Sequence, residues 1–139
     1  MTEKRLKNWE KQKFSFNRAN EAEFTKGLRG FAEYRDLGIS EATGGQIHAH
    51  VIRVKKEDFE KHHTTGMHRH HCDFQMNYLL KGSISFVYEG EGEITFNAGD
   101  SWIQPAGIVH DEISCSDDVE ILEIYSPAIH ETERLDQNT

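Results

Sequence analysis

Histidines gather in one stretch of the chain, GMHRHHCDFQMNYLLKG, which runs from Gly66 to Gly82. His68 and His70 lie two residues apart, so in an extended strand their side chains point to the same face. Imidazole nitrogen is a good ligand for zinc, copper, iron and nickel. His110, in the later stretch GDSWIQPAGIVH, offers a third such nitrogen. These residues predict a binding site for one transition-metal ion.

The first stretch resembles one of the two sequence motifs of the cupin superfamily, G-x5-H-x-H-x3–4-E-x6-G. His68 and His70 match its histidines, a gap of four residues leads to Gln75, and a gap of six leads to Gly82. The resemblance implies that Gln75 stands where the motif has its carboxylate ligand. The implied metal ligands are His68, His70, Gln75 and His110.

The second stretch resembles the other cupin motif, G-x5-P-x-G-x2-H-x3-N. The residues in register with it are Gly99, Pro105, Gly107 and His110. The sixteen residues between the motifs, 83–98, are similar to the short spacer of small bacterial single-domain cupins. The resemblance implies a jelly-roll barrel with a metal site, but it leaves the reaction open because cupins include enzymes and binding proteins.

The chain departs from the two motifs at three positions. His62 stands at the opening glycine, where Gly66 can provide the turn instead, and Ser114 stands at the closing asparagine. Gln75 replaces a carboxylate with a neutral amide, so the ligands would leave the charge of a divalent ion uncompensated and strengthen its Lewis acidity. Asp73, an even step from Gln75, is the alternative oxygen ligand.

Short runs of β-forming residues alternate with glycine-rich turns along most of the chain. We expect strands at 31–35, 46–54, 74–80, 83–89, 93–96, 101–104, 112–115 and 119–125. This pattern predicts an all-β antiparallel sandwich or barrel, and the resemblance implies the double-stranded β-helix, or jelly roll, of the cupins. The polar segment 55–66 is expected to be a loop.

The 139 residues are the length of one domain. We expect residues 1–29 to form an irregular N-terminal arm, with one short helix near residues 4–13. The barrel is expected to span residues 30–130, followed by a flexible C-terminal tail at residues 131–139.

The charge balance limits the classes of partner. A net charge of −8 disfavours nucleic acid and anionic membranes. No apolar run has the length of a membrane span, and the first residues lack the apolar core of a signal peptide, so a cytoplasmic location is expected. Cys72 and Cys115 are too few and too far apart for a disulfide framework or a CxxC site.

Alternation along residues 74–80 assigns Gln75, Asn77 and Leu79 to the interior of the barrel. The residues of the opposite face are Phe74, Met76, Tyr78 and Leu80. This face is too apolar to be left in water, so we expect another sheet or a second subunit to cover it. The usual solution in cupins is a homodimer.

Catalysis by proton transfer requires a titratable side chain near the metal ion. Glu112 shares a strand face with His110, and His50 belongs to a second H-x-H pair with His48. That pair lacks the rest of the motif, so it is expected to line the pocket rather than bind the metal. The candidate catalytic residues are Glu112, His50 and Tyr34, with Asp73 and His48 as further titratable groups.

The remaining histidines are assigned no direct part in the site. His71 follows His70 and is expected to point to the other face, while His62 and His63 lie in a polar segment. His130 lies close to the C-terminal tail and is given no role.

The sequence therefore predicts a cupin with a divalent transition metal, namely Fe, Zn, Ni, Mn or Cu. The function that this site favours is an enzyme that chelates a small oxygenated substrate, a carbonyl, enol or carboxylate, as a dioxygenase or as an isomerase, lyase or cyclase. The neutral Gln75 favours the non-redox group. The alternatives are a non-catalytic small-molecule binder or sensor, and a structural dimer whose site is vestigial.

Overall fold

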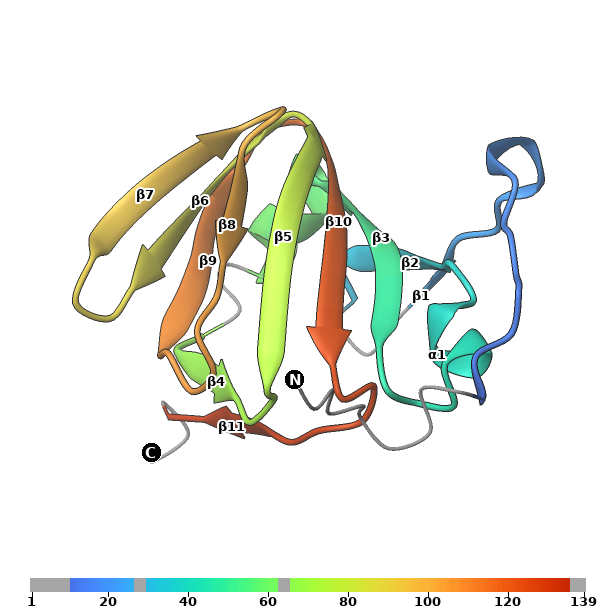
Figure 1. Cartoon of the computed structure of the whole chain (residues 1–139). Helices are drawn as coiled ribbons and strands as arrows, with labels where there is room; N and C mark the ends of the chain where they lie inside the picture. The colour runs from blue at the N-terminus through green and yellow to red at the C-terminus, as the bar shows by residue number, and fades with distance from the viewer. Residues whose placement is uncertain (1–10, 27–29, 63–65, 136–139) are drawn as a thin grey trace.

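The computed structural model of the protein describes residues 11–26, 30–62 and 66–135. Its strands form two antiparallel sheets (Figure 1). One sheet has six strands in the order β1 (Thr25–Lys26), β2 (Ala32–Asp36), β3 (His48–Lys55), β10 (Asp118–Ser126), β5 (Phe74–Lys81) and β8 (Ser101–Ile103). The other has five, in the order β11 (Thr132–Arg134), β4 (His68–His70), β9 (His110–Cys115), β6 (Ser83–Tyr88) and β7 (Gly92–Asn97).

The two sheets converge at one end, at the top of Figure 1, and diverge toward the end where β4 and β11 lie. Apolar side chains from both sheets fill the space between them. The most deeply buried are Leu79, Ile84, Val54 and Val119. This arrangement confirms the predicted all-β barrel, and all eight predicted strands are present with bounds that differ by at most two residues.

The segment predicted to be a polar loop contains a helix instead, α2 (Lys56–His62). The prediction was wrong because Phe59 gives this segment an apolar anchor: its ring is buried and packs edge-on against Phe31, with 5.2 Å between the ring centroids. Lys56 and Glu60, one helical turn apart, form a 4.0 Å ion pair on the exposed side. A second short helix, α1 (Ile39–Ala42), precedes β3.

The described part of the N-terminal arm, residues 11–26, is largely exposed and contains a 3-10 turn at Ala19–Glu21. It is attached to the barrel by β1, which pairs with β2, and by a hydrogen bond from Lys13 N to Ala42 O at 2.9 Å. The helix expected near residues 4–13 lies almost entirely outside the described residues.

The C-terminal segment differs from the expected flexible tail. β11 pairs in antiparallel register with β4, placing Thr132 opposite His70 and Arg134 opposite His68. The sheet therefore continues past residue 130, because the chain after β10 crosses the open end of the barrel (Figure 1). Residues 136–139 lie outside the described residues.

The two faces of β5 follow the predicted alternation. Gln75, Asn77 and Leu79 are buried. On the opposite face, Phe74 and Tyr78 are each 40% exposed, so the described part of the chain covers this face only in part and places no further sheet on it. The expectation of a covering sheet is wrong for the single chain, and the homodimer stays a prediction. None of the helices in the described ranges is long and apolar enough to cross a membrane.

Candidate metal centre and pocket

The three histidines predicted from the motifs come together inside the open end of the barrel. β4 and β9 pair with His68 directly opposite His110, and His70 lies two residues further along β4. One ring nitrogen from each of the three lies within 4.8 Å of the others. His68 and His110 are each only 3% exposed. The predicted convergence of His68, His70 and His110 is therefore present.

Backbone carbonyls set the protonation of two of these rings. The Nδ1 of His68 is 2.6 Å from the carbonyl oxygen of Gly66, and the Nδ1 of His110 is 3.0 Å from that of Ile108. A carbonyl oxygen only accepts, so each Nδ1 holds the proton and donates it, which leaves the lone pair on Nε2. Gly66, with φ of +81°, forms the turn that replaces the missing motif glycine.

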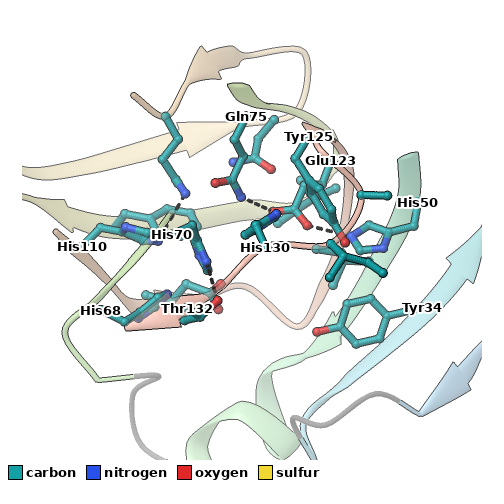
Figure 2. Close-up of a pocket in the computed structure, with 18 residues that line it drawn as sticks. Tyr34, His50, His68, His70, Gln75, His110, Glu123, Tyr125, His130 and Thr132 are labelled. Atoms are coloured by element: carbon teal, nitrogen blue, oxygen red, sulfur yellow. Dashed lines mark hydrogen bonds and ion pairs between the residues drawn. The ribbon is translucent and has the colours of Figure 1, made fainter. Parts of the chain in front are cut away.

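The third ring, that of His70, is held from the C-terminal strand. Its Nδ1 is hydrogen-bonded to the Thr132 hydroxyl at 2.8 Å (Figure 2). Thr132 lies directly opposite His70 in the β4–β11 pairing. Each of the three imidazoles thus has a fixed partner at Nδ1, and this arrangement orients Nε2 for binding a metal ion.

A buried hydrogen-bond chain supports His110 from the barrel interior. The amide nitrogen of Gln104 is 3.2 Å from His110 Nε2, and the Gln104 oxygen accepts a hydrogen bond from the Tyr88 hydroxyl. That hydroxyl accepts in turn from Trp102 Nε1 at 2.8 Å. Burial raises the pKa of Tyr88, so its hydroxyl stays a donor and keeps the Gln104 amide oriented with its nitrogen toward His110. A metal ion on His110 Nε2 would take the lone pair that accepts this hydrogen bond, so Gln104 would have to move aside.

Gln75 lies in the same cavity as the three histidines and is 4% exposed. Its amide nitrogen donates to Oε2 of Glu123 at 2.7 Å. Asp73, the alternative oxygen ligand, is exposed and precedes the first residue of β5. It does not line the cavity, so the alternation that places Gln75 inward does not extend to it.

The cavity has a volume of about 430 Å³ and opens at the end of the barrel crossed by the C-terminal segment. The three predicted catalytic residues, Glu112, His50 and Tyr34, all line it. His50 and Tyr34 lie across the cavity from the metal-binding histidines (Figure 2). Its apolar wall is made by Ile52, Phe86, Ile121, Ala128 and Ile129.

The protein-family profile described as "Cupin domain" matches residues 55–125, just over half of the chain. The chain belongs to the cupin family. This match contains both motifs, from β4 through the His110 turn, and it confirms the resemblance found in the sequence. A comparison with curated proteins gave no match.

Solved structures show the same cupin jelly roll. The polyketide cyclase RemF from Streptomyces resistomycificus aligns with a TM-score of 0.71 and 15% identity, over 88% of this chain and 86% of RemF. KdgF from Halomonas sp. aligns with a TM-score of 0.64 and 18% identity, over 81% and 94%. An RmlC-like cupin from Shewanella frigidimarina aligns at 0.60 and 20%, over 85% and 95%. At these identities the likeness shows the fold alone.

The donor set of this cupin fits a transition-metal ion. Three imidazoles converge, and each has its Nδ1 committed to another group. Two Zn–N bonds of about 2.0–2.1 Å at a tetrahedral angle separate their nitrogens by ~3.4 Å, so nitrogens that lie within 4.8 Å of one another would have to approach by at most ~1.4 Å to share one ion. The structure therefore supports a metal ion in the cupin site and leaves its identity open.

A chain of polar side chains runs along the opposite wall. His50 Nε2 is 2.6 Å from Oε1 of Glu123, and His50 Nδ1 is 2.8 Å from Nε2 of His48. Burial, and secondarily the neighbouring His50, lower the pKa of His48. Sequence reasoning found His50 but missed Glu123. The signal was available, because Glu123 shares the inward face of β10 with Ile121 and Tyr125.

Tyr125 and His130 complete the mouth of the pocket. Burial, and then the charge of Glu123, raise the pKa of Tyr125 to about 12, so its hydroxyl is protonated at neutral pH. The His130 ring lies 4.8 Å from the ring of Tyr125 and 5.9 Å from that of His70. His130, to which the sequence analysis gave no role, lines the cavity, because the chain after β10 returns across it instead of leaving the barrel.

Neither His71 nor His48 lines the cavity. His71 is exposed and hydrogen-bonds Glu133 at 2.9 Å, so the prediction that it points to the other face is confirmed. His48 reaches the pocket only through His50, since it is not among the lining residues. His62 ends α2, and His63 lies outside the described residues.

Cys72 and Cys115 are free and buried, and we expect both to react slowly with thiol reagents. Burial raises the pKa of Cys115 to about 11 and also raises that of Cys72. Because the thiolate is the reactive form, Cys115 should react at pH 8 about 100-fold more slowly in the native protein than in denaturant. A timed reaction with Ellman's reagent measures this, and rapid native labelling of both thiols would contradict it.

Proposed function

We propose that the protein is a metal-dependent cupin enzyme. It would bind a small oxygenated molecule, a carbonyl, enol or carboxylate, and catalyse proton transfer of the isomerase, lyase or cyclase type. The main support is that one cavity contains both a group of metal-binding side chains and an acid–base pair. The first is the converging nitrogens of His68, His70 and His110, and the second is the hydrogen-bonded pair His50–Glu123 on the opposite wall.

In this proposal His68, His70 and His110 hold the ion, with the amide oxygen of Gln75 as a fourth ligand. The bound ion supplies Lewis acidity, which polarises a carbonyl or stabilises an enolate oxygen. The carbonyls of Gly66 and Ile108 fix the Nδ1 proton of His68 and His110, and the Thr132 hydroxyl holds His70 at its Nδ1, which keeps the three rings oriented for this role.

The chain's own residues would handle the proton. His50 and Glu123 are 2.6 Å apart and form an acid–base pair beside the cavity. The second ring nitrogen of His50 bonds to His48, which would pass the proton away from the pocket. The Tyr34 ring lies 5.1 Å from that of His50 and would hold it in place. Glu112, on the β9 wall, is the second carboxylate available as a base.

The cavity also limits the substrate. A volume of about 430 Å³ suits a small molecule. The protonated hydroxyl of Tyr125 and the amide of Asn77 can donate hydrogen bonds to its oxygens, while Phe86 and Ile121 contact apolar parts. RemF is a polyketide cyclase, and the cavity of this chain would suit a substrate of related chemistry, an oxygenated ring or a small enol.

Elemental analysis followed by a substrate screen tests the proposal. Untagged protein should contain near-stoichiometric metal, and its His68→Ala variant should not. The loaded protein should then convert a diketone, catechol-like compound or uronate without consuming oxygen. Conversion with oxygen uptake would instead indicate a dioxygenase, and ligand-induced thermal stabilisation without turnover would indicate a binder. Absence of metal after reconstitution would refute the proposal.

A further inference from the structure

Gln75, which stands at the carboxylate position of the cupin motif, lies against a carboxylate from another strand. Its amide nitrogen donates to Glu123 Oε2 at 2.7 Å. β5 and β10 pair with Gln75 opposite Tyr125 and with Asn77 opposite Glu123. Gln75 and Glu123 are therefore diagonal neighbours on the same inward face, a distance that long side chains bridge.

This contact determines which atom Gln75 presents to the metal-binding histidines. An amide has its NH2 donor and its carbonyl acceptor on opposite sides, and a carboxylate only accepts. With the NH2 group bound to Glu123, the oxygen of Gln75 is directed away from Glu123, where it accepts a long hydrogen bond from the Cys72 thiol at 3.9 Å that a metal ion would replace. Figure 2 shows the amide nitrogen toward Glu123 and the oxygen on the side of His70 and His110. The reverse orientation would put two oxygens in contact.

Glu123 is itself held at both oxygens. Its Oε1 is 2.6 Å from His50 Nε2, while its Oε2 accepts from Gln75. His50 is fixed in turn by His48 at 2.8 Å. The carboxylate is thus part of a connected network on β3, β5 and β10, and it has little freedom to turn away from Gln75.

We propose that Glu123 is a positioning residue of the metal centre. It holds Gln75 with its oxygen toward the histidines. It also supplies the negative charge that the amide ligand lacks, and this charge lies one hydrogen bond away from the ligand. The pair Gln75–Glu123 would then do together what one carboxylate does in the usual motif. This inference rests on the metal site of the proposed function and adds to it how the fourth ligand is oriented and charged.

A double-mutant cycle with Co²⁺ tests the inference. The affinity for Co²⁺, measured against a competing chelator, is expected to fall about 10- to 100-fold in Gln75→Ala and in Glu123→Ala. If Glu123 acts through Gln75, the double variant should bind no more weakly than Gln75→Ala, and the visible Co²⁺ spectra of all three should be alike. Losses that multiply, or a Glu123→Ala spectrum identical to that of the wild type, would overturn the inference.

An exchange of the two residues provides the complementary test. Gln75→Glu alone places two carboxylates in contact and should lower the melting temperature of the metal-free protein by roughly 5 °C. The pair Gln75→Glu/Glu123→Gln restores one amide and one carboxylate, so it should recover that stability and bind Co²⁺ within about tenfold of the wild type. This exchange decides the question if Glu123→Ala does not fold. Failure of the exchange to rescue the Gln75→Glu defect would contradict the inference.

The matched control is Glu120→Ala. Glu120 lies on the same strand as Glu123 but on the outward face, where it pairs with Arg53 at 3.8 Å. Its loss should leave Co²⁺ affinity and spectrum unchanged. The outcomes separate the two proposals: a wild type that does not bind Co²⁺ refutes the metal centre, whereas normal binding with multiplicative losses refutes only the role of Glu123.

Discussion

The His110→Ala variant is expected to lose its metal and to remain folded. His110 offers one of the three converging nitrogens, and the carbonyl of Ile108 orients its ring through Nδ1. Because mutation of the partners behind a ligand alone costs about 10- to 100-fold in metal affinity, loss of the ligand itself should cost more than about 100-fold. Elemental analysis and competition with a chelator measure the loss.

The fold should survive because the most buried side chains, among them Leu79 and Val119, lie outside the metal site. A stability loss of about 1–3 kcal/mol is expected, because the variant would lose the stacking of the His110 ring on the Tyr88 ring, whose centroids are 5.4 Å apart. The matched control is His71→Ala, because His71 is exposed and binds Glu133. Full metal content in His110→Ala, or equal loss in His71→Ala, would show the ligand set to be wrong.

Local spacing in the sequence was sufficient to predict the strands and the convergence of the three histidines. His68 and His70 share a face because strand side chains alternate, and the second motif places His110 at the start of β9, opposite His68. The same alternation correctly assigned Gln75, Asn77 and Leu79 to the interior. These features depend on residues close in the chain or on a motif whose register is specific.

The partners of those residues depend on pairings between distant strands, which spacing does not reveal. Glu123 meets Gln75 only because β10 lies beside β5, and Thr132 meets His70 only because the chain after β10 returns to pair with β4. His130 enters the pocket for the same reason. The helix α2 was missed because one buried side chain, Phe59, holds an otherwise polar segment.

The Gly82→Ala variant is expected to have the largest effect on stability. Gly82 forms the turn between β5 and β6 with φ of +83°, a left-handed conformation that costs an alanine about 1–2 kcal/mol. Its added Cβ would also overlap the carbonyl oxygen of Asp118, the first residue of β10, and would lie 2.6 Å from Ser116 Oγ. Because a backbone atom cannot turn aside as a flexible side chain can, we expect a total loss of about 3–5 kcal/mol.

Gly90→Ala separates the steric overlap from the backbone conformation. Gly90 has nearly the same φ, +82°, but an added Cβ there would meet nothing within 4 Å. It should therefore cost only the conformational part, about 1–2 kcal/mol. Urea unfolding of the two variants measures the difference, and equal losses would contradict the overlap at Asp118.

The same comparison extends to the metal centre, because β10 also carries Glu123, which holds Gln75. Displacing the start of β10 should disturb this contact. A Gly82→Ala protein that still folds should therefore bind Co²⁺ more weakly than Gly90→Ala.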